Sequence, residues 1–228
     1  MLMGTNRGMV QREFQKLKER VKLLLFTSLT KEGYRQCPAC EDTAEFVKEL
    51  AGLSGGKIVV EEYSTLSSSE VDREMVKKHA VDHVPTIIFD GFGIRYVGAP
   101  LGNEAGSFLK TLIMASSGET GVTKPIRFML RKIKKPKVVR TFVTLTCPYC
   151  PHAVLQANRI ALASDKVFHE VIEVYEHPDL ANKYLGATKG VPTTLIGEEV
   201  VLAGVPPVRE FLEKLAGWEA VNDTGMYT

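Results

Sequence analysis

The chain has 228 residues, of which 44% are hydrophobic and 25% are charged, a composition typical of a globular protein with an apolar core. Its 29 basic and 27 acidic residues give a formal net charge of only +2, which argues against a partner that is a nucleic acid or an anionic membrane. The apolar run at residues 21–26 is far too short to span a bilayer, and residues 1–10 lack signal-peptide features, so we expect a cytoplasmic protein.

In chain order, the first half alternates between strand and helix patterns. A short helix is predicted around residues 11–20, and a strand-like apolar run follows at 22–27. After a Cys-x-x-Cys pair, apolar residues recur at helical spacing from Ala44 to Leu50. The other strands and helices predicted in this half lie at residues 57–63, 70–79, 87–89, 94–97 and 104–115.

The second half repeats this order. A helix is predicted at residues 124–132, a strand rich in β-branched residues at 137–143, and a helix again after a Cys-x-x-Cys pair. The remaining predicted elements lie at residues 167–174, 179–185, 194–196, 200–203 and 208–216. Each unit therefore has the order β-α-β-α-β-β-α after its first helix. We expect its first two strands to be parallel and its last two to form a hairpin.

Two motifs recur at matching places in the halves. Each half has a Cys-x-x-Cys pair and, later, a Val-Pro-Thr triplet that leads into a short strand. Pro85 follows Cys37 by 48 residues, and Pro192 follows Cys147 by 45 residues. The similar offsets indicate an internal repeat of about one small domain.

A boundary between the repeats is predicted at residues 116–121, which are rich in small, turn-forming residues. We therefore divide the chain into an N-terminal unit of residues 1–118 and a C-terminal unit of residues 119–228. The tail after Trp218 is expected to be loose.

All four cysteines fall in these two pairs, at Cys37, Cys40, Cys147 and Cys150. A secreted disulfide scaffold would be shorter and richer in cysteine, whereas paired cysteines in an intracellular chain are more often catalytic or metal-binding. A disulfide across three residues closes only a small loop and stabilises little, so a purely structural role is disfavoured.

The order strand, Cys-x-x-Cys, helix and Val-Pro-Thr before a strand resembles the thioredoxin fold, twice over. Two such units with Cys-Pro-Ala-Cys and Cys-Pro-Tyr-Cys resemble the glutaredoxin-like protein disulfide oxidoreductases of thermophilic archaea and bacteria. A thermophilic source also agrees with the scarcity of Asn and Gln, although seven Met residues do not support it. The resemblance implies an α/β protein with tandem thioredoxin-like folds, each a central mixed sheet flanked by helices.

The same resemblance implies protein thiol–disulfide exchange with no metal and no organic cofactor. Its partners would be protein disulfides or dithiols and a flavoprotein of the thioredoxin reductase type, and the direction of electron flow is left open. Thiol–disulfide exchange requires an attacking thiolate and a second thiol that releases the product. Cys37 and Cys147 are expected at a helix start, where free N–H groups and the helix dipole stabilise a thiolate. Pro38 and Pro148 are expected at the first helical position.

The resemblance also implies that Pro85 and Pro192 are cis and lie beside the cysteine pairs. A cis bond would turn the backbone of Val84 and Val191 outward, where an extended substrate peptide could pair with it. Tyr149 offers apolar surface and a hydroxyl group to the same peptide. We therefore expect the second centre to carry most of the activity on protein substrates.

The second unit departs from thioredoxins at Thr141, where a buried acid stands in that family, and Thr141 cannot take a proton. Lys31 and Arg35 lie in the charged loop before Cys37, where we expect them to be solvated rather than to act on the thiolate. His152 is interpreted as a surface residue of a helix, although it could assist proton transfer.

Two other functions remain open at this point. One is a dedicated electron-transfer component of a peroxide-reducing system. The other is a non-enzymatic zinc scaffold, although zinc ribbons place about 15–20 residues between their cysteine pairs, and here the gap runs from Cys40 to Cys147.

Overall fold

Strands and helices alternate along the chain largely as the sequence predicts, and the computed structural model describes residues 4–186, 190–197 and 200–217. The first half consists of α1 (Gly4–Phe14), β1 (Val21–Thr27), α2 (Cys40–Leu53), β2 (Ile58–Ser64), α3 (Glu70–Lys78), β3 (Thr86–Phe89), β4 (Ile94–Val97) and α4 (Glu104–Ser117). The second half consists of α5 (Lys124–Leu130), β5 (Lys137–Val143), α6 (Cys150–Leu162), β6 (Val167–Glu173), α7 (Pro178–Leu185), β7 (Thr193–Ile196), β8 (Val200–Ala203) and α8 (Val208–Leu215). The tail after Trp218, expected to be loose, lies outside the described residues. No helix in the described part of the chain is long and apolar enough to cross a bilayer.

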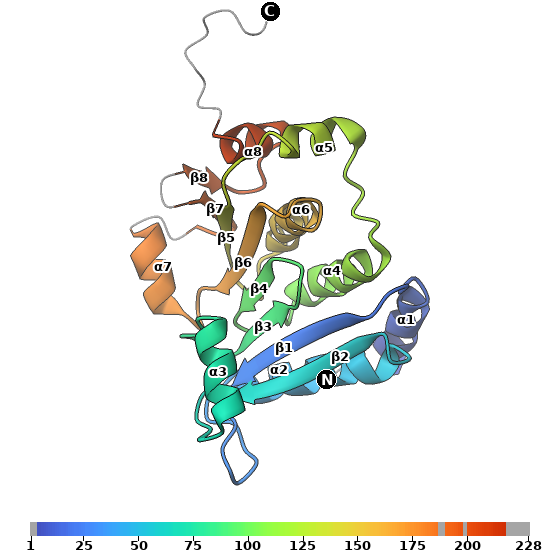
Figure 1. Ribbon diagram of the computed structural model, residues 1–228, viewed down its shortest axis with the longest axis vertical. Coiled ribbons are helices and arrows are strands. Elements are labelled where there is room, and N and C mark those ends of the chain that lie inside the picture. The colour runs from blue at the N-terminus through green and yellow to red at the C-terminus, as the bar shows by residue number, and fades with distance from the viewer. Residues whose placement is uncertain (1–3, 187–189, 198–199, 218–228) are drawn as a thin grey trace, which may run out of the picture.

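All eight strands join in one sheet, in the order β2-β1-β3-β4-β6-β5-β7-β8. The order within the first four strands is repeated in the second four, which confirms a tandem thioredoxin-like architecture. In each half the first two strands pair in parallel, and the last two form an antiparallel hairpin, as predicted. Figure 1 shows the halves following one another along the sheet, with α4 of the first beside α6 of the second.

The halves are joined edge to edge through β4 and β6, which pair in parallel from Ile94 opposite His169 to Val97 opposite Ile172. This join uses the hairpin edge of the first half and the opposite edge of the second half. The halves therefore associate head to tail, and one outer edge of each, β2 and β8, remains unpaired within the described residues.

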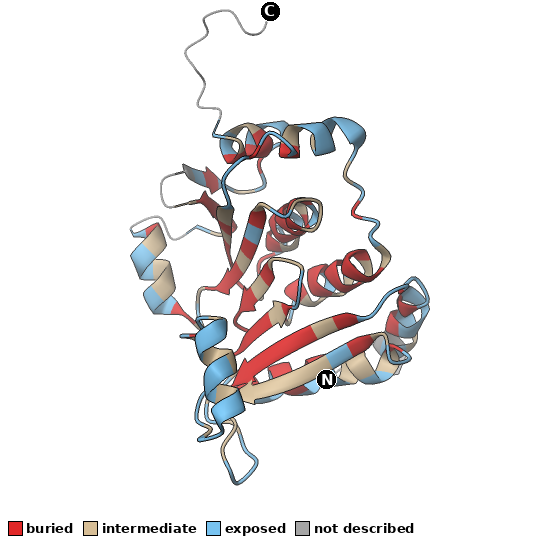
Figure 2. Ribbon diagram, viewed as in Figure 1, coloured by how far each residue is buried: buried red, intermediate tan, exposed pale blue. Residues whose placement is uncertain are grey.

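Helices cover both faces of the sheet because strand side chains alternate between them. Leu23 and Leu25 of β1 belong to the main core beneath α2 and α4, whereas Leu24 and Phe26 pack against α3 on the other face. Helix α7 covers the second half on the same face as α3, over Phe142. Figure 2 shows the central strands buried and the outer surfaces of α3 and α7 exposed. Each fully buried large side chain contributes about 1.5–3 kcal/mol to folding.

The helix predicted at residues 11–20 is displaced, since α1 spans Gly4–Phe14. Helix α1 ends at Phe14 because the backbone of residues 18 and 19 hydrogen-bonds to the end of α4 instead of continuing the helix. The amide of Glu19 donates to the carbonyl of Ser116, and the amide of Lys18 donates to the Ser116 hydroxyl. These bonds align residues 18–20 for entry into β1, which local sequence periodicity could not indicate.

Candidate active site

Both cysteine pairs follow the carboxyl end of a central strand, β1 in the first half and β5 in the second. Cys37 is bonded to Cys40 and Cys147 to Cys150, with Cα–Cα distances of 5.3 and 5.5 Å. The two connections differ in length. Residues 28–36 lead from β1 to the first pair, whereas only residues 144–146 lead from β5 to the second.

The first cysteine of each pair lies in a turn that precedes its helix, and the second is the first residue of the helix. Helices α2 and α6 begin at the second cysteine, so Pro38 and Pro148 lie in the turn before the helix rather than at its first position. In the first pair, the Cys40 amide donates to the Cys37 carbonyl at 3.2 Å, which is a single tight turn. The prediction that the prolines occupy the first helical position was therefore wrong, because each helix begins two residues after its proline.

The first cysteine of each pair is the more accessible one. Cys147 is 8% exposed and Cys37 is partly exposed, whereas Cys40 and Cys150 are completely buried. A substrate disulfide could therefore meet only the first sulfur of each pair. This difference supports the attacking role predicted for Cys37 and Cys147, which stays a prediction.

Each centre has one polar group beside a sulfur atom. The Cys150 amide points at Cys147 Sγ at 3.1 Å, so a thiolate there would accept this hydrogen bond. In the first centre Ser28 lies instead beside the sulfur of the second cysteine. Its hydroxyl oxygen accepts from the Cys37 amide at 2.6 Å and lies 3.8 Å from Cys40 Sγ.

The peptide bonds before Pro85 and Pro192 are both cis, as the resemblance to thioredoxins implied. Both prolines are buried and the valine before each is only partly so. In the second centre, the Val191 carbonyl oxygen lies 3.9 Å from Cys147 Sγ, so this segment adjoins the disulfide. In the first centre, Val84 packs beside α3 with the small core around Phe26.

Two tyrosines in the loops that follow β5 and β6 are largely exposed. Tyr149 directly precedes α6 and is 68% exposed, and its predicted contact with a substrate stays a prediction. Tyr175 is 79% exposed and follows β6, the neighbour of β5. Sequence reasoning did not single out Tyr175, whose loop begins beside the end of β5, where the Val174 amide donates to the Val143 carbonyl at 3.0 Å.

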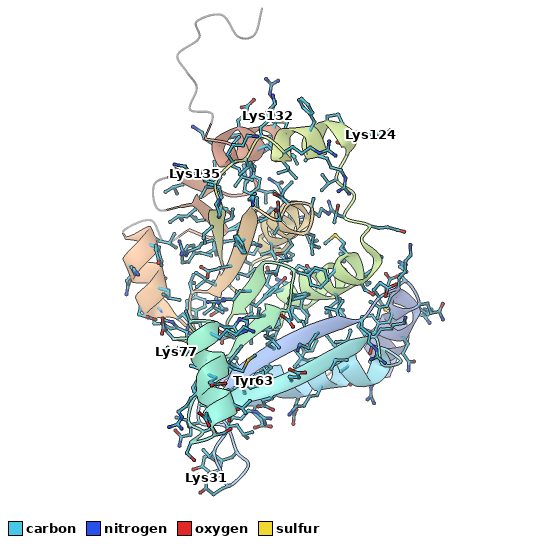
Figure 3. All side chains as sticks on the ribbon, in the orientation of Figure 1. Lys31, Tyr63, Lys77, Lys124, Lys132 and Lys135 are labelled. Carbon is cyan, nitrogen blue, oxygen red and sulfur yellow. A yellow bond between two sulfur atoms is a disulfide. The ribbon has the colours of Figure 1, made fainter. Side chains whose placement is uncertain are left out.

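Arg35 is not a solvated loop charge, contrary to the prediction. Its side chain is only 8% exposed and donates to both oxygens of Glu62, at 2.7 and 2.8 Å, and to Glu41. Although burial opposes ionisation of Glu62, hydrogen bonds from Arg35, Lys48 and a threonine lower its pKa to about 2. The positive charge of Arg35 is therefore paired with the carboxylates of Glu62 and Glu41. Lys31, in contrast, is exposed at the tip of the loop (Figure 3).

Thr141 is completely buried and belongs to a chain of polar side chains. It bonds to Thr194 and to His169 Nε2, and His169 Nδ1 bonds to Asn158 at 2.6 Å. Asn158 then donates to the Tyr96 hydroxyl group, so the chain crosses from the second half to the first. Burial lowers the pKa of His169 to about 3, which keeps this imidazole neutral. His152, by contrast, is exposed on α6 as expected.

The first half also supports the second centre directly. The Asn103 amide donates to the Leu145 carbonyl at 2.9 Å, two residues before Cys147. Gly102 has a φ of 55°, and a Cβ atom there would lie 2.6 Å from the same carbonyl oxygen. Only glycine allows this close approach without displacing the loop that leads into Cys147.

Glu104 is a buried carboxylic acid beside this loop, only 1% exposed at the start of α4. Its Oε2 accepts from the Ser107 hydroxyl at 2.5 Å, and its Oε1 has no partner among the described residues. Burial raises its pKa to about 7, against the opposing hydrogen bond from Ser107. Sequence analysis gave no sign of this, because an acid in a first helical turn is usually exposed.

The Glu104→Gln variant should lose part of the pH dependence of stability. Because the folded pKa is raised, the stability that Glu104 contributes is complete below its unfolded pKa and is lost as pH rises through about 7. Relative to the variant, the wild-type free energy of unfolding should therefore fall by about 2–3 kcal/mol between pH 5 and pH 8. Urea denaturation at both pH values measures this. Glu45→Gln, at an exposed position of α2, is the matched control, and parallel pH curves for Glu104→Gln and wild type would refute the assignment.

Comparison with known proteins agrees with this geometry. Residues 137–216 match the thioredoxin domain family. A crystal structure of a protein disulfide oxidoreductase from Aeropyrum pernix is 27% identical, with a TM-score of 0.84, and the match covers 98% of this chain and 96% of that one. A structure of the alkylhydroperoxide reductase component AhpF from Enterococcus faecalis is 24% identical, with a TM-score of 0.79 over 94% of this chain and 99% of that one, which shows the shared fold.

Curated relatives are longer than this chain. A Bacillus subtilis protein called NADH dehydrogenase is 24% identical over 176 residues, which are 77% of this chain and 31% of the relative. A component of the alkyl hydroperoxide reductase of Staphylococcus epidermidis is 28% identical over 81 residues, or 36% of this chain and 16% of the relative. The chain thus spans less than a third of the length of these relatives.

Proposed function

We propose that this chain is a protein disulfide oxidoreductase that catalyses thiol–disulfide exchange at two Cys-x-x-Cys centres. The observation that carries the proposal is the same in both halves. At the carboxyl end of a central strand, a cysteine that keeps some exposure, 8% in the case of Cys147, is bonded to a completely buried one three residues later. The likeness to the Aeropyrum pernix protein disulfide oxidoreductase over nearly the whole chain supports it.

In the reducing direction, the Cys147 thiolate attacks one sulfur of a substrate disulfide, and the other substrate sulfur leaves as a thiolate that takes up a proton. The Cys150 thiolate then attacks Cys147 Sγ, which releases the second substrate thiol and closes the disulfide of the enzyme. Two electrons have then passed to the substrate. Cys37 and Cys40 divide the same work in the first centre, and the reverse steps oxidise a dithiol.

Substrate peptides would bind along the segment before each cis-proline. Val191 is the better supported contact, because its carbonyl oxygen adjoins Cys147 Sγ. An extended peptide could hydrogen-bond to this exposed backbone, and Tyr149 would cover its side chains. Val84 and Pro85 would serve the first centre in the same way, with Pro192 holding the segment in the second.

We propose that the chain is cytoplasmic and that its electron donor is a flavoprotein of the thioredoxin reductase type, which reduces one or both centres. Each half would be one functional unit, divided between residues 118 and 119. The end of α4 supports this boundary, because Gly118 adopts a left-handed φ of 72° directly after the helix.

A second candidate function is electron transfer to one dedicated partner in a peroxide-reducing system. The likeness to the alkyl hydroperoxide reductase components favours it. A zinc scaffold built on the cysteines is disfavoured, since both pairs are closed as disulfides and β3, β4 and β6 lie between the strands that carry them.

Insulin reduction by dithiothreitol tests the first function against the second. The wild-type chain should accelerate reduction at least tenfold over dithiothreitol alone, because the Cys150 amide would stabilise the Cys147 thiolate at neutral pH, where a free thiol is mostly protonated. A chain with all four cysteines replaced by Ser should give only the background rate. If the wild type left both insulin and scrambled ribonuclease at background while its own disulfides remained reducible, the single-partner function would replace the proposal.

A further inference from the structure

Three potential metal ligands from different halves meet at one place outside the redox centres. His83 follows α3 in the first half, and His177 and Asp179 lie at the start of α7 in the second. One ligand atom from each of the three lies within 4.8 Å of the others. His83 Nε2 and Asp179 Oδ2 are 2.7 Å apart, and the two imidazole rings meet edge to face with their centres 5.1 Å apart.

His177 is the member that a purely structural role does not explain. The residue is only 5% exposed, and its Nε2 is buried without a hydrogen-bond partner in the described part of the chain. A buried ring nitrogen without a partner costs free energy, so it requires an explanation.

We propose that His83, His177 and Asp179 form a binding site for a divalent cation of the zinc class. Two imidazoles and one carboxylate suit zinc, whereas magnesium and calcium prefer oxygen ligands throughout. Three protein ligands would leave a fourth position for water.

The geometry requires only a small contraction. Zinc–ligand bonds of about 2.0–2.1 Å place tetrahedral ligands roughly 3.3 Å apart, against a widest separation of up to 4.8 Å here. The side chain of Asp179 is 63% exposed and that of His83 27%, so both can rotate toward the buried His177. The cation would replace the hydrogen bond between His83 and Asp179.

A cation at this place would add a metal link between the two halves, which already meet through the pairing of β4 with β6 and the packing of α4 on α6. Its ligand His83 lies two residues before Pro85, in the segment proposed to hold substrate at the first centre. The site itself does not depend on the redox function, because it uses none of the cysteines.

Isothermal titration of the oxidised, tag-free chain with zinc sulfate tests the proposal. Keeping both disulfides closed prevents the cysteine thiolates from binding zinc. One zinc ion should bind per chain with a micromolar or lower Kd, and Co²⁺ in its place should show the visible absorption of a tetrahedral complex. At a hundredfold excess of zinc over Kd, the Tm should rise by about 5–10 °C.

Two variants at accessible positions carry the test, since replacing the buried His177 could impair folding. His83→Gln should weaken zinc binding at least a hundredfold and nearly abolish the rise in Tm at the same zinc concentration, whereas Asp179→Asn should weaken binding at least tenfold and reduce the rise by about half or more. His152→Gln, on the surface of α6, is the matched control and should bind as the wild type does. Absence of one-to-one binding, or equal affinity in all variants, would overturn the proposal and leave the three residues as a hydrogen-bonded contact between the halves.

Discussion

Replacing Cys147 and Cys150 together by Ser should slow insulin reduction at least tenfold, whereas replacing Cys37 and Cys40 should leave most of the activity. The expectation rests on the surroundings of the second centre. Tyr149 is 68% exposed beside it, and the Val191 carbonyl oxygen lies 3.9 Å from the attacking sulfur. Ala39 offers no such surface in the first centre, and the loop of residues 28–36 gives that centre a different approach.

The accessibility of the cysteines points the other way, since Cys37 is more exposed than Cys147. We give greater weight to substrate contacts, because exchange also requires the peptide to be held near the sulfur. Initial rates of the two double variants with insulin and dithiothreitol decide between these effects. Equal rates, or a larger loss from the first pair, would disprove the expectation. Loss of the activity in both double variants would show that the centres depend on each other.

Replacing Cys150 alone by Ser, in a chain that already lacks Cys37 and Cys40, should trap a mixed disulfide between Cys147 and the substrate. Without Cys150, only a thiol from solution can resolve the adduct. The neighbouring thiol acts within the same molecule, where effective concentrations reach about 10⁵ M or more, so the lifetime of the adduct should increase by at least about 10³-fold. Non-reducing electrophoresis and mass spectrometry after mixing with a disulfide-containing peptide measure the adduct.

The reciprocal variant is the control for these roles. With Cys147 replaced by Ser in the same background, little adduct should form, because Cys150 is completely buried and cannot meet a substrate disulfide. Accumulation of adduct at Cys150 in this chain would reverse the assignment of attacking and resolving cysteines.

Much of the fold follows from local signals in the sequence. The spacing of apolar residues and the repeated Cys-x-x-Cys and Val-Pro-Thr motifs predicted two units with parallel first strands and a terminal hairpin, and the pairing of the strands confirms this. The cis bonds before Pro85 and Pro192 were implied by the family resemblance and are present.

The features that sequence reasoning missed all depend on contacts between distant segments. The helix predicted at residues 11–20 ends at Phe14 because residues 18 and 19 bond to Ser116. From the sequence, Arg35 was predicted to be an exposed loop charge, but the fold places Glu62 of β2 beside it. The ligand cluster of His83, His177 and Asp179 combines residues from both halves of the chain. No periodicity or motif in the sequence indicates these contacts between distant segments.

The order of the strands also determines how the two centres can communicate. Strands β1 and β5 point in the same direction with three strands between them, so both cysteine pairs open at the same end of the sheet. Four strand spacings of about 4.8 Å place the centres roughly 19 Å apart, and a twist of about 20–25° per strand turns one away from the other. Disulfide exchange requires sulfur atoms in bonding contact, so electrons cannot pass directly between the centres of one intact chain. Any exchange between the two must be bimolecular, through a diffusing thiol or a second chain, and its rate should rise with concentration while each centre's own turnover per chain stays constant.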